Sequence, residues 1–133
     1  MQIKKLIIAQ IIAHARKVAP LEACGYLAAR DGIVTIAYEL TNIEQSREHF
    51  SFDPQEQFKV MRDARGKGLE IISVYHSHPA SFARPSPEDI KLAFDPGMIY
   101  VIVSLSDGKN EVGAFKIKNQ QAYPESLEVI EDG

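Results

Sequence analysis

Two histidines and an aspartate could together bind a metal ion. His76 and His78 stand two residues apart in the segment 70–78, which alternates like a β-strand. In a strand, such residues project from one face, about 6.6 Å apart along the backbone. Val74 and Ile72 continue that face, so the histidines end an apolar row. Paired neutral imidazoles suit zinc, which also accepts a carboxylate, and Asp89 would be the third ligand.

Three protein ligands would leave one of the four tetrahedral positions of zinc open, as in catalytic sites. Water in that position loses a proton near neutral pH and becomes a nucleophile. A second interpretation concerns Ser86 and Asp89, which match the S-x-x-acid pattern of a helix start, with Pro87 at the first helical position. The two interpretations are compatible, because a capped helix is a rigid mount for a ligand.

With these residues in place, the sequence resembles the JAMM (MPN+) zinc metallopeptidases, and within them the compact prokaryotic branch. The family motif is an upstream glutamate, then H-x-H-P and P-S-x-x-D. Here these are Glu22, the segment 76–79 (HSHP) and the segment 85–89 (PSPED). The resemblance implies one zinc ion held by His76, His78 and Asp89. It also implies Glu22 as the general acid/base and Ser86 as a hydroxyl directed at the oxyanion.

The resemblance also implies a substrate. The family hydrolyses peptide or isopeptide bonds, typically just after the C-terminal glycines of ubiquitin or ubiquitin-like proteins. The compact branch trims ubiquitin-like sulfur-carrier proteins. We therefore expect the C-terminal tail of such a carrier as the partner, with cleavage after its Gly-Gly. The sequence leaves open the identity of the carrier, the oligomeric state and any need for an activating partner.

Hydrophobic periodicity predicts the elements that position these residues. A helix is expected over 5–18, a second beginning at Asp53-Pro54 and a short third at Ser86-Pro87. Strands are expected at 22–30, 33–40, 70–78, 98–105, 111–118 and 127–130. The predicted fold class is α/β: a mixed, mostly antiparallel sheet flanked by about three helices. The resemblance identifies it as the cytidine-deaminase-like/MPN fold.

Length and composition fit one globular domain, residues 1–133, which the resemblance makes a single JAMM/MPN metallopeptidase domain. The formal net charge of −3 gives no basic field for nucleic acid, and the apolar run after Lys4-Lys5 is too short for a signal peptide or a membrane span. Cys24 is the only cysteine, which excludes an intrachain disulfide. We therefore expect a cytoplasmic protein without a membrane or nucleic-acid partner.

Some residues and alternatives are set aside. His14 is expected to be exposed on the first helix, Cys24 to be an inert strand residue, and the C-terminal acids to be solvated. A metal-free MPN-like scaffold for protein interaction is the main alternative, but such members lack the ligand set that this chain retains. A cupin-type oxygenase would need a glutamate soon after the histidines and a further downstream histidine, and the chain has neither.

Overall fold

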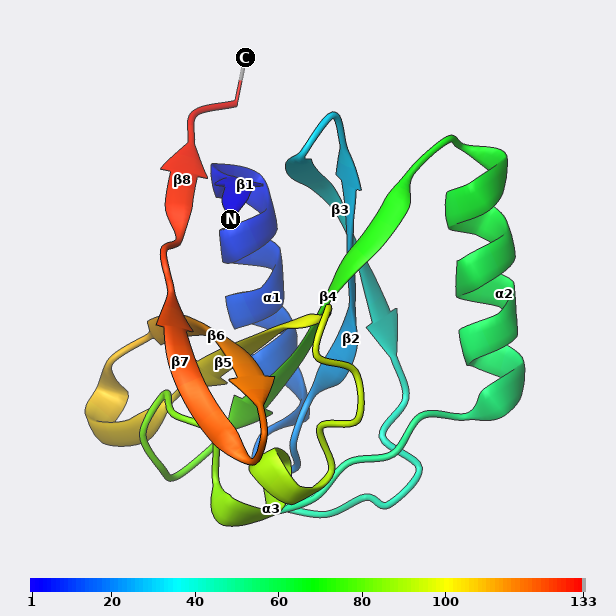
Figure 1. The fold of residues 1–133 in the computed structure, drawn as a ribbon. Helices are drawn as coiled ribbons and strands as arrows, with labels where there is room; N and C mark the ends of the chain where they lie inside the picture. The colour runs from blue at the N-terminus through cyan, green and yellow to red at the C-terminus, as the bar shows by residue number, and fades with distance from the viewer. Residues whose placement is uncertain (133) are drawn as a thin grey trace.

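One mixed sheet organises the chain. The computed structural model describes residues 1–132, and in them eight strands follow the order β7-β6-β5-β4-β2-β3-β1-β8 (Figure 1). The strands are β1 (Gln2–Lys4), β2 (Cys24–Arg30), β3 (Ile33–Leu40), β4 (Glu70–His78), β5 (Ile99–Ser104), β6 (Glu111–Lys118), β7 (Gln121–Glu125) and β8 (Glu128–Ile130). Pairs β1–β3, β1–β8 and β4–β5 are parallel and the other four are antiparallel.

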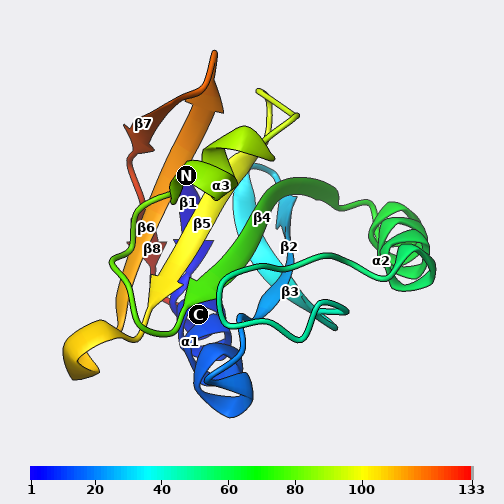
Figure 2. The same cartoon turned by 90° about the horizontal axis from the view of Figure 1, so that it is seen from below.

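Three α-helices cover the sheet: α1 (Lys5–Val18), α2 (Pro54–Gly66) and α3 (Pro87–Lys91). The predicted mixed sheet with about three helices is therefore confirmed. Figure 2 shows α1 on one side of the sheet, and α3 and α2 on the other. Strand β7 was not predicted, because Pro124 interrupts its pattern and it pairs only with the edge of β6.

The main core lies between α1 and the sheet. Ile7 and Ile11 of α1 pack with Leu27 of β2 and Tyr75 of β4, all of them buried. The opposite face has a smaller core, in which Ala28 packs against Ala64 of α2. Neighbouring residues of β2 thus serve opposite faces, as the period of a strand requires.

A β-bulge in β4 changes one prediction about the strand that bears the histidines. The pairing with β2 moves from Ser73 opposite Leu27 to Ile71 opposite Ala28, which leaves Ile72 without a partner. As a result, Ile71 and Val74 pack on one face, whereas Ile72 packs on the α1 face. The expectation that Ile72 shares a face with Val74 is wrong, because an extra residue in a strand shifts the alternation.

The C-terminal acids, expected to be solvated, contact the start of the chain. Strand β8 pairs with β1, and Gln2 Nε2 donates to Glu128 Oε2 at 3.1 Å. The Leu6 amide at the start of α1 donates to Asp132 Oδ2 at 3.0 Å. Glu128 and Asp132 are exposed, as expected, and Asp132 in addition stabilises the start of α1, because carboxylates near free helix amides are favourable.

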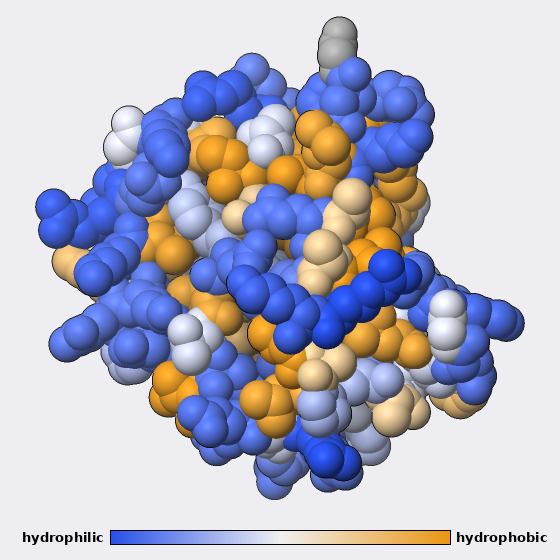
Figure 3. All heavy atoms as spheres, turned by 180° about the vertical axis from the view of Figure 1, so that it is seen from behind, coloured by the Kyte–Doolittle hydropathy of each residue, from blue (hydrophilic) through white to orange (hydrophobic). Residues whose placement is uncertain are grey.

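The surface agrees with the composition. Seen from behind, hydrophilic residues form much of the outline, with hydrophobic patches between them (Figure 3). Within residues 1–132, no helix has the length and hydrophobicity that crossing a bilayer requires.

Candidate active site

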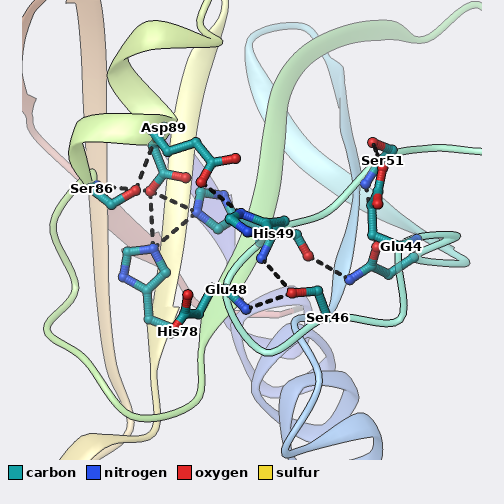
Figure 4. Close-up of polar contacts among 11 residues, drawn as sticks. Glu44, Ser46, Glu48, His49, Ser51, His78, Ser86 and Asp89 are labelled. Atoms are coloured by element: carbon teal, nitrogen blue, oxygen red, sulfur yellow. Dashed lines mark hydrogen bonds and ion pairs between the residues drawn. The ribbon is translucent and has the colours of Figure 1, made fainter.

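The end of β4 brings two imidazoles to one point. His76 Nε2 and His78 Nε2 lie 3.1 Å apart, and Asp89 Oδ2 lies 3.1 Å from the first and 3.0 Å from the second. Figure 4 shows the Asp89 carboxylate reaching from α3 toward the His78 ring. The structure therefore brings together all three residues that the sequence nominated as metal ligands.

The two histidine rings are held in different ways. His78 Nδ1 lies 2.8 Å from the Phe82 carbonyl oxygen, an arrangement in which Nδ1–H donates and the Nε2 lone pair faces Asp89. The His76 ring stacks on Phe50, with centroids 4.8 Å apart. Both histidines are buried. Fixing one ring nitrogen by a hydrogen bond leaves the other free to act as a metal ligand.

Asp89 is positioned by the start of α3. Ser86 Oγ accepts the Asp89 amide at 3.0 Å, and Asp89 Oδ2 accepts the Ser86 amide at 2.9 Å, which forms a capping box. Burial opposes the charge of this carboxylate, but the neighbouring His76 and His78 and the Ser86 amide outweigh burial and hold the pKa of Asp89 below its ordinary value. The ligand is therefore anionic over the physiological pH range.

The donor set fits zinc. Ligand atoms at about 2.05 Å from a tetrahedral zinc ion are about 3.3 Å apart, and the three atoms here are separated by 3.0 to 3.1 Å. Because His78 Nδ1 donates to Phe82, the His78 Nε2 lone pair faces Asp89 Oδ2, and two such acceptors repel unless a proton or a cation lies between them. Two imidazoles and one carboxylate are also a known donor set of catalytic zinc.

Glu22 lies just before β2, and hydrogen bonds to the loop 41–53 hold its backbone. Its amide donates to the Ser46 carbonyl at 2.8 Å, and its carbonyl accepts from Asn42 Nδ2 at 3.1 Å. The side chain is only 3% exposed, and Oε1 has no hydrogen-bond partner among residues 1–132. Burial raises the pKa of Glu22 to about 8, although nearby His78 opposes this shift. A carboxyl group with a pKa near neutrality can both take and return a proton.

Glu22, His78 and Ser86 line one cleft of about 410 Å³. A second pocket of about 260 Å³ is lined by His76, Asp89 and the Phe50 ring, and it shares Glu48 and Glu88 with the first. The three converging side chains of His76, His78 and Asp89 therefore adjoin both hollows, one lined by Glu22 and one with aromatic walls. A substrate chain that crosses the ligands would occupy both.

Residues of the loop 41–53 contribute to the site, although their spacing in the sequence did not predict this role. Phe50 supports His76, and the exposed His49 pairs through Nδ1 with Glu88 Oε2 at 2.6 Å (Figure 4). Only the packing of this loop against β4 and α3 reveals these roles.

Among the residues set aside, Cys24 is buried in β2 as expected, but the expectation for His14 is wrong. His14 is buried, and its Nδ1 lies 2.7 Å from the Tyr75 hydroxyl. The apolar stripe of α1 did not include His14, because the polar partner that makes burial favourable comes from β4, 61 residues away.

A mixed sheet that brings two histidines and an aspartate together beside a buried glutamate defines the class of JAMM-type zinc hydrolases. The chain belongs to the family described as "Prokaryotic homologs of the JAB domain", whose model matches residues 4–118.

Curated relatives carry peptidase names. The "CysO-cysteine peptidase" of Mycobacterium tuberculosis is 36% identical over 124 residues, covering 91% of this chain and 85% of the relative. The "Desampylase" of Haloferax volcanii is 35% identical over 106 residues, covering 74% and 76%.

Solved structures share the fold. Protein DSY2949 of Desulfitobacterium hafniense superposes with a TM-score of 0.90 at 42% identity, covering 98% of this chain and 93% of that one. AF2198 of Archaeoglobus fulgidus, a JAB1/MPN domain protein, gives a TM-score of 0.70 at 22% identity, with 98% of this chain and 100% of that one covered. The second likeness supports the fold alone.

Proposed function

We propose that this protein is a zinc peptidase that removes residues attached after the C-terminal Gly-Gly of a ubiquitin-like sulfur-carrier protein. The observation that carries the proposal is the convergence of three side-chain atoms within 3.1 Å of one another. Glu22 is buried nearby, and one of its carboxylate oxygens has no hydrogen-bond partner within residues 1–132. The substrate class is supported by relatives named for CysO-cysteine and for TtuB-protein conjugates.

In this proposal, His76, His78 and Asp89 hold the zinc ion. Zinc in this position supplies a Lewis acid that lowers the pKa of water toward neutrality. Glu22 takes the proton from the attacking water and returns it to the leaving amine as the C–N bond breaks. Without zinc, burial holds the pKa of Glu22 near 8, and a zinc ion nearby would favour the carboxylate form that takes the proton. Its burial keeps bulk water from competing for the proton.

Ser86 would serve two functions. Its oxygen accepts the Asp89 amide, which positions the ligand, and its hydroxyl proton remains available for donation. Because Ser86 lines the same cleft as Glu22, the hydroxyl can reach a substrate oxygen that gains negative charge. Removing one such donor from an oxyanion site elsewhere raises the barrier by about 2.7–4 kcal/mol.

The proposal also covers the domain organisation and the cellular compartment. We take residues 1–133 as one catalytic domain and place its work in the cytoplasm, where ubiquitin-like carriers are made and a lone thiol such as Cys24 stays reduced. The alternative of a metal-free scaffold is disfavoured, because such a scaffold has no need for three converged ligand atoms beside a buried glutamate.

The test uses ubiquitin-like sulfur carriers encoded by the same genome, extended beyond their Gly-Gly. Mass spectrometry should show loss of the extension with the zinc-loaded protein and no loss after chelation. Asp89→Ala and His78→Ala should lose both bound zinc and cleavage. Intact carriers in the presence of the zinc-loaded protein would refute the proposal, and a zinc-free wild-type protein that cleaves would refute the assigned metal.

A further inference from the structure

The position of Glu22 defines which side of the site receives the leaving group. Glu22 lines two hollows, and of these the one that it shares with His78 and Ser86 adjoins the converging His76, His78 and Asp89. If Glu22 returns a proton to the leaving amine, that amine must lie in this cleft. The acyl part with its Gly-Gly then lies toward the pocket on the His76 side. Whatever binds the residue after the Gly-Gly must therefore be sought around the Glu22 cleft.

Arg47 lies at that place. It lines the Glu22 cleft of about 410 Å³ and also an adjoining hollow of about 660 Å³ bounded by Pro20 and Pro79. Among the residues of 1–132 that line either hollow, Arg47 is the only lysine or arginine. Its guanidinium makes no ion pair or hydrogen bond with the rest of residues 1–132, so all of its donors remain available to a ligand.

The backbone under Arg47 is fixed relative to Glu22. The carbonyl of Ser46, the residue before it, accepts the Glu22 amide at 2.8 Å. The Ser46 hydroxyl accepts the amides of Glu48 and His49 at 3.1 and 3.2 Å, which forms a tight turn around Arg47 (Figure 4). Arg47 therefore belongs to the same loop segment that hydrogen-bonds the backbone of Glu22, the proposed base.

Neighbouring acids do not neutralise Arg47. Glu88 is occupied by His49 at 2.6 Å, and Glu48 is exposed and outside ion-pair distance of the guanidinium. Apart from Arg47 and His78, the titratable side chains that line the cleft are the carboxyl groups of Glu22, Glu48 and Glu88, which disfavour an anionic leaving group. Arg47 therefore decides whether a carboxylate can enter.

We propose, on the basis of the proposed function, that Arg47 binds the free α-carboxylate of a single amino acid joined to the carrier's C-terminal glycine. The guanidinium fork matches a carboxylate in two hydrogen bonds, which a carboxamide cannot reproduce. Hydrolysis consumes one water and breaks the glycine C–N bond. It leaves a glycine carboxylate on the carrier and releases the amino acid with its amine protonated. The preferred substrate is then a carrier with one terminal residue, in contrast to an isopeptide whose leaving lysine lies within a chain.

The test compares two forms of the extended carrier, each with one alanine after the Gly-Gly, ending in a free carboxylate or in a carboxamide. Wild-type zinc-loaded protein should cleave the carboxylate form with a kcat/KM about tenfold or more above that of the carboxamide form. Arg47→Gln should abolish this preference by slowing the carboxylate form alone. Arg47→Lys should restore part of it, because the charge returns without the fork.

Two further measurements separate binding from chemistry. The Kd of the zinc-free protein for the two carriers should show the same preference in the wild type and none in Arg47→Gln. Arg16→Gln removes an exposed arginine on α1 that lines neither hollow, and should leave both preferences unchanged.

The outcomes are distinguishable. Equal cleavage of both carriers by the wild type, or a preference that survives Arg47→Gln, would overturn the role of Arg47 while leaving the peptidase function intact. Cleavage of neither carrier would overturn both proposals.

Discussion

Ser86 and Asp89 hold each other through two reciprocal hydrogen bonds, of 3.0 Å from the Asp89 amide and 2.9 Å to Asp89 Oδ2. The same Asp89 oxygen faces the Nε2 atoms of His76 and His78. Asp89 therefore links the start of α3 to the proposed metal site, and replacing Ser86 affects both.

Replacing Ser86 can separate its two roles. Glycine is a tolerated N-cap, so Ser86→Gly should lower the free energy of unfolding by only a few tenths of a kcal/mol, whereas Ser86→Ala should lower it by about 1 kcal/mol. Both variants lack the hydroxyl, so kcat should fall in both by about 10²–10³-fold. Urea unfolding and steady-state kinetics measure the two effects. A Ser86→Gly enzyme with normal kcat would restrict Ser86 to capping.

Glu22→Gln should remove proton transfer and keep the metal. Glutamine has nearly the same shape, and none of the three converging ligand atoms belongs to Glu22. We expect one zinc per chain by elemental analysis and a kcat lowered by about 10²–10⁴-fold.

Glu70→Gln is the matched control, since Glu70 is exposed at the start of β4, at the opposite end of the strand from His78. This control should keep full activity. Normal turnover by Glu22→Gln would show that the proton acceptor is another group.

The stability of the zinc-free protein should depend on pH through Glu22. Burial raises its pKa from 4.5 to about 8, so between these values the folded protein keeps a proton that the unfolded chain has lost. The stabilising contribution is complete below pH 4.5 and is lost as the pH rises through about 8.

Glu22→Gln removes this dependence. Relative to the wild type, the zinc-free variant should therefore gain free energy of unfolding as the pH rises across that window, measured by urea unfolding after chelation. A constant difference between the two proteins would contradict a raised pKa.

The sequence predicted the elements more fully than the surroundings of the site. The Asp53-Pro54 and Ser86-Pro87 helix starts are local signals, and both helices begin there. The H-x-H spacing likewise predicted that two imidazoles would share a face. The loop residue Phe50 gave no such signal, because its role depends on how the loop packs on the histidines. The side on which Ile72 packs depends on a bulge that hydrophobicity alone does not encode.

Gly25 offers a test of how closely the strands under the site are packed. A Cβ at this position would clash with the Tyr38 carbonyl oxygen and would lie 2.7 Å from the Tyr75 ring. The carbonyl belongs to the paired strand β3, and Tyr75 precedes His76, so neither can yield without moving the sheet. Gly25→Ala should lower the free energy of unfolding by about 1–3 kcal/mol or more and weaken zinc binding.

Gly66→Ala is the control, because a Cβ there meets nothing within 4 Å at the end of α2. It should leave stability unchanged or raise it by up to about 1 kcal/mol. Urea unfolding and zinc titration of the two variants measure both effects. If Gly25→Ala matched Gly66→Ala in both, the close approach of β2 to Tyr38 and Tyr75 would not be what holds His76 in place.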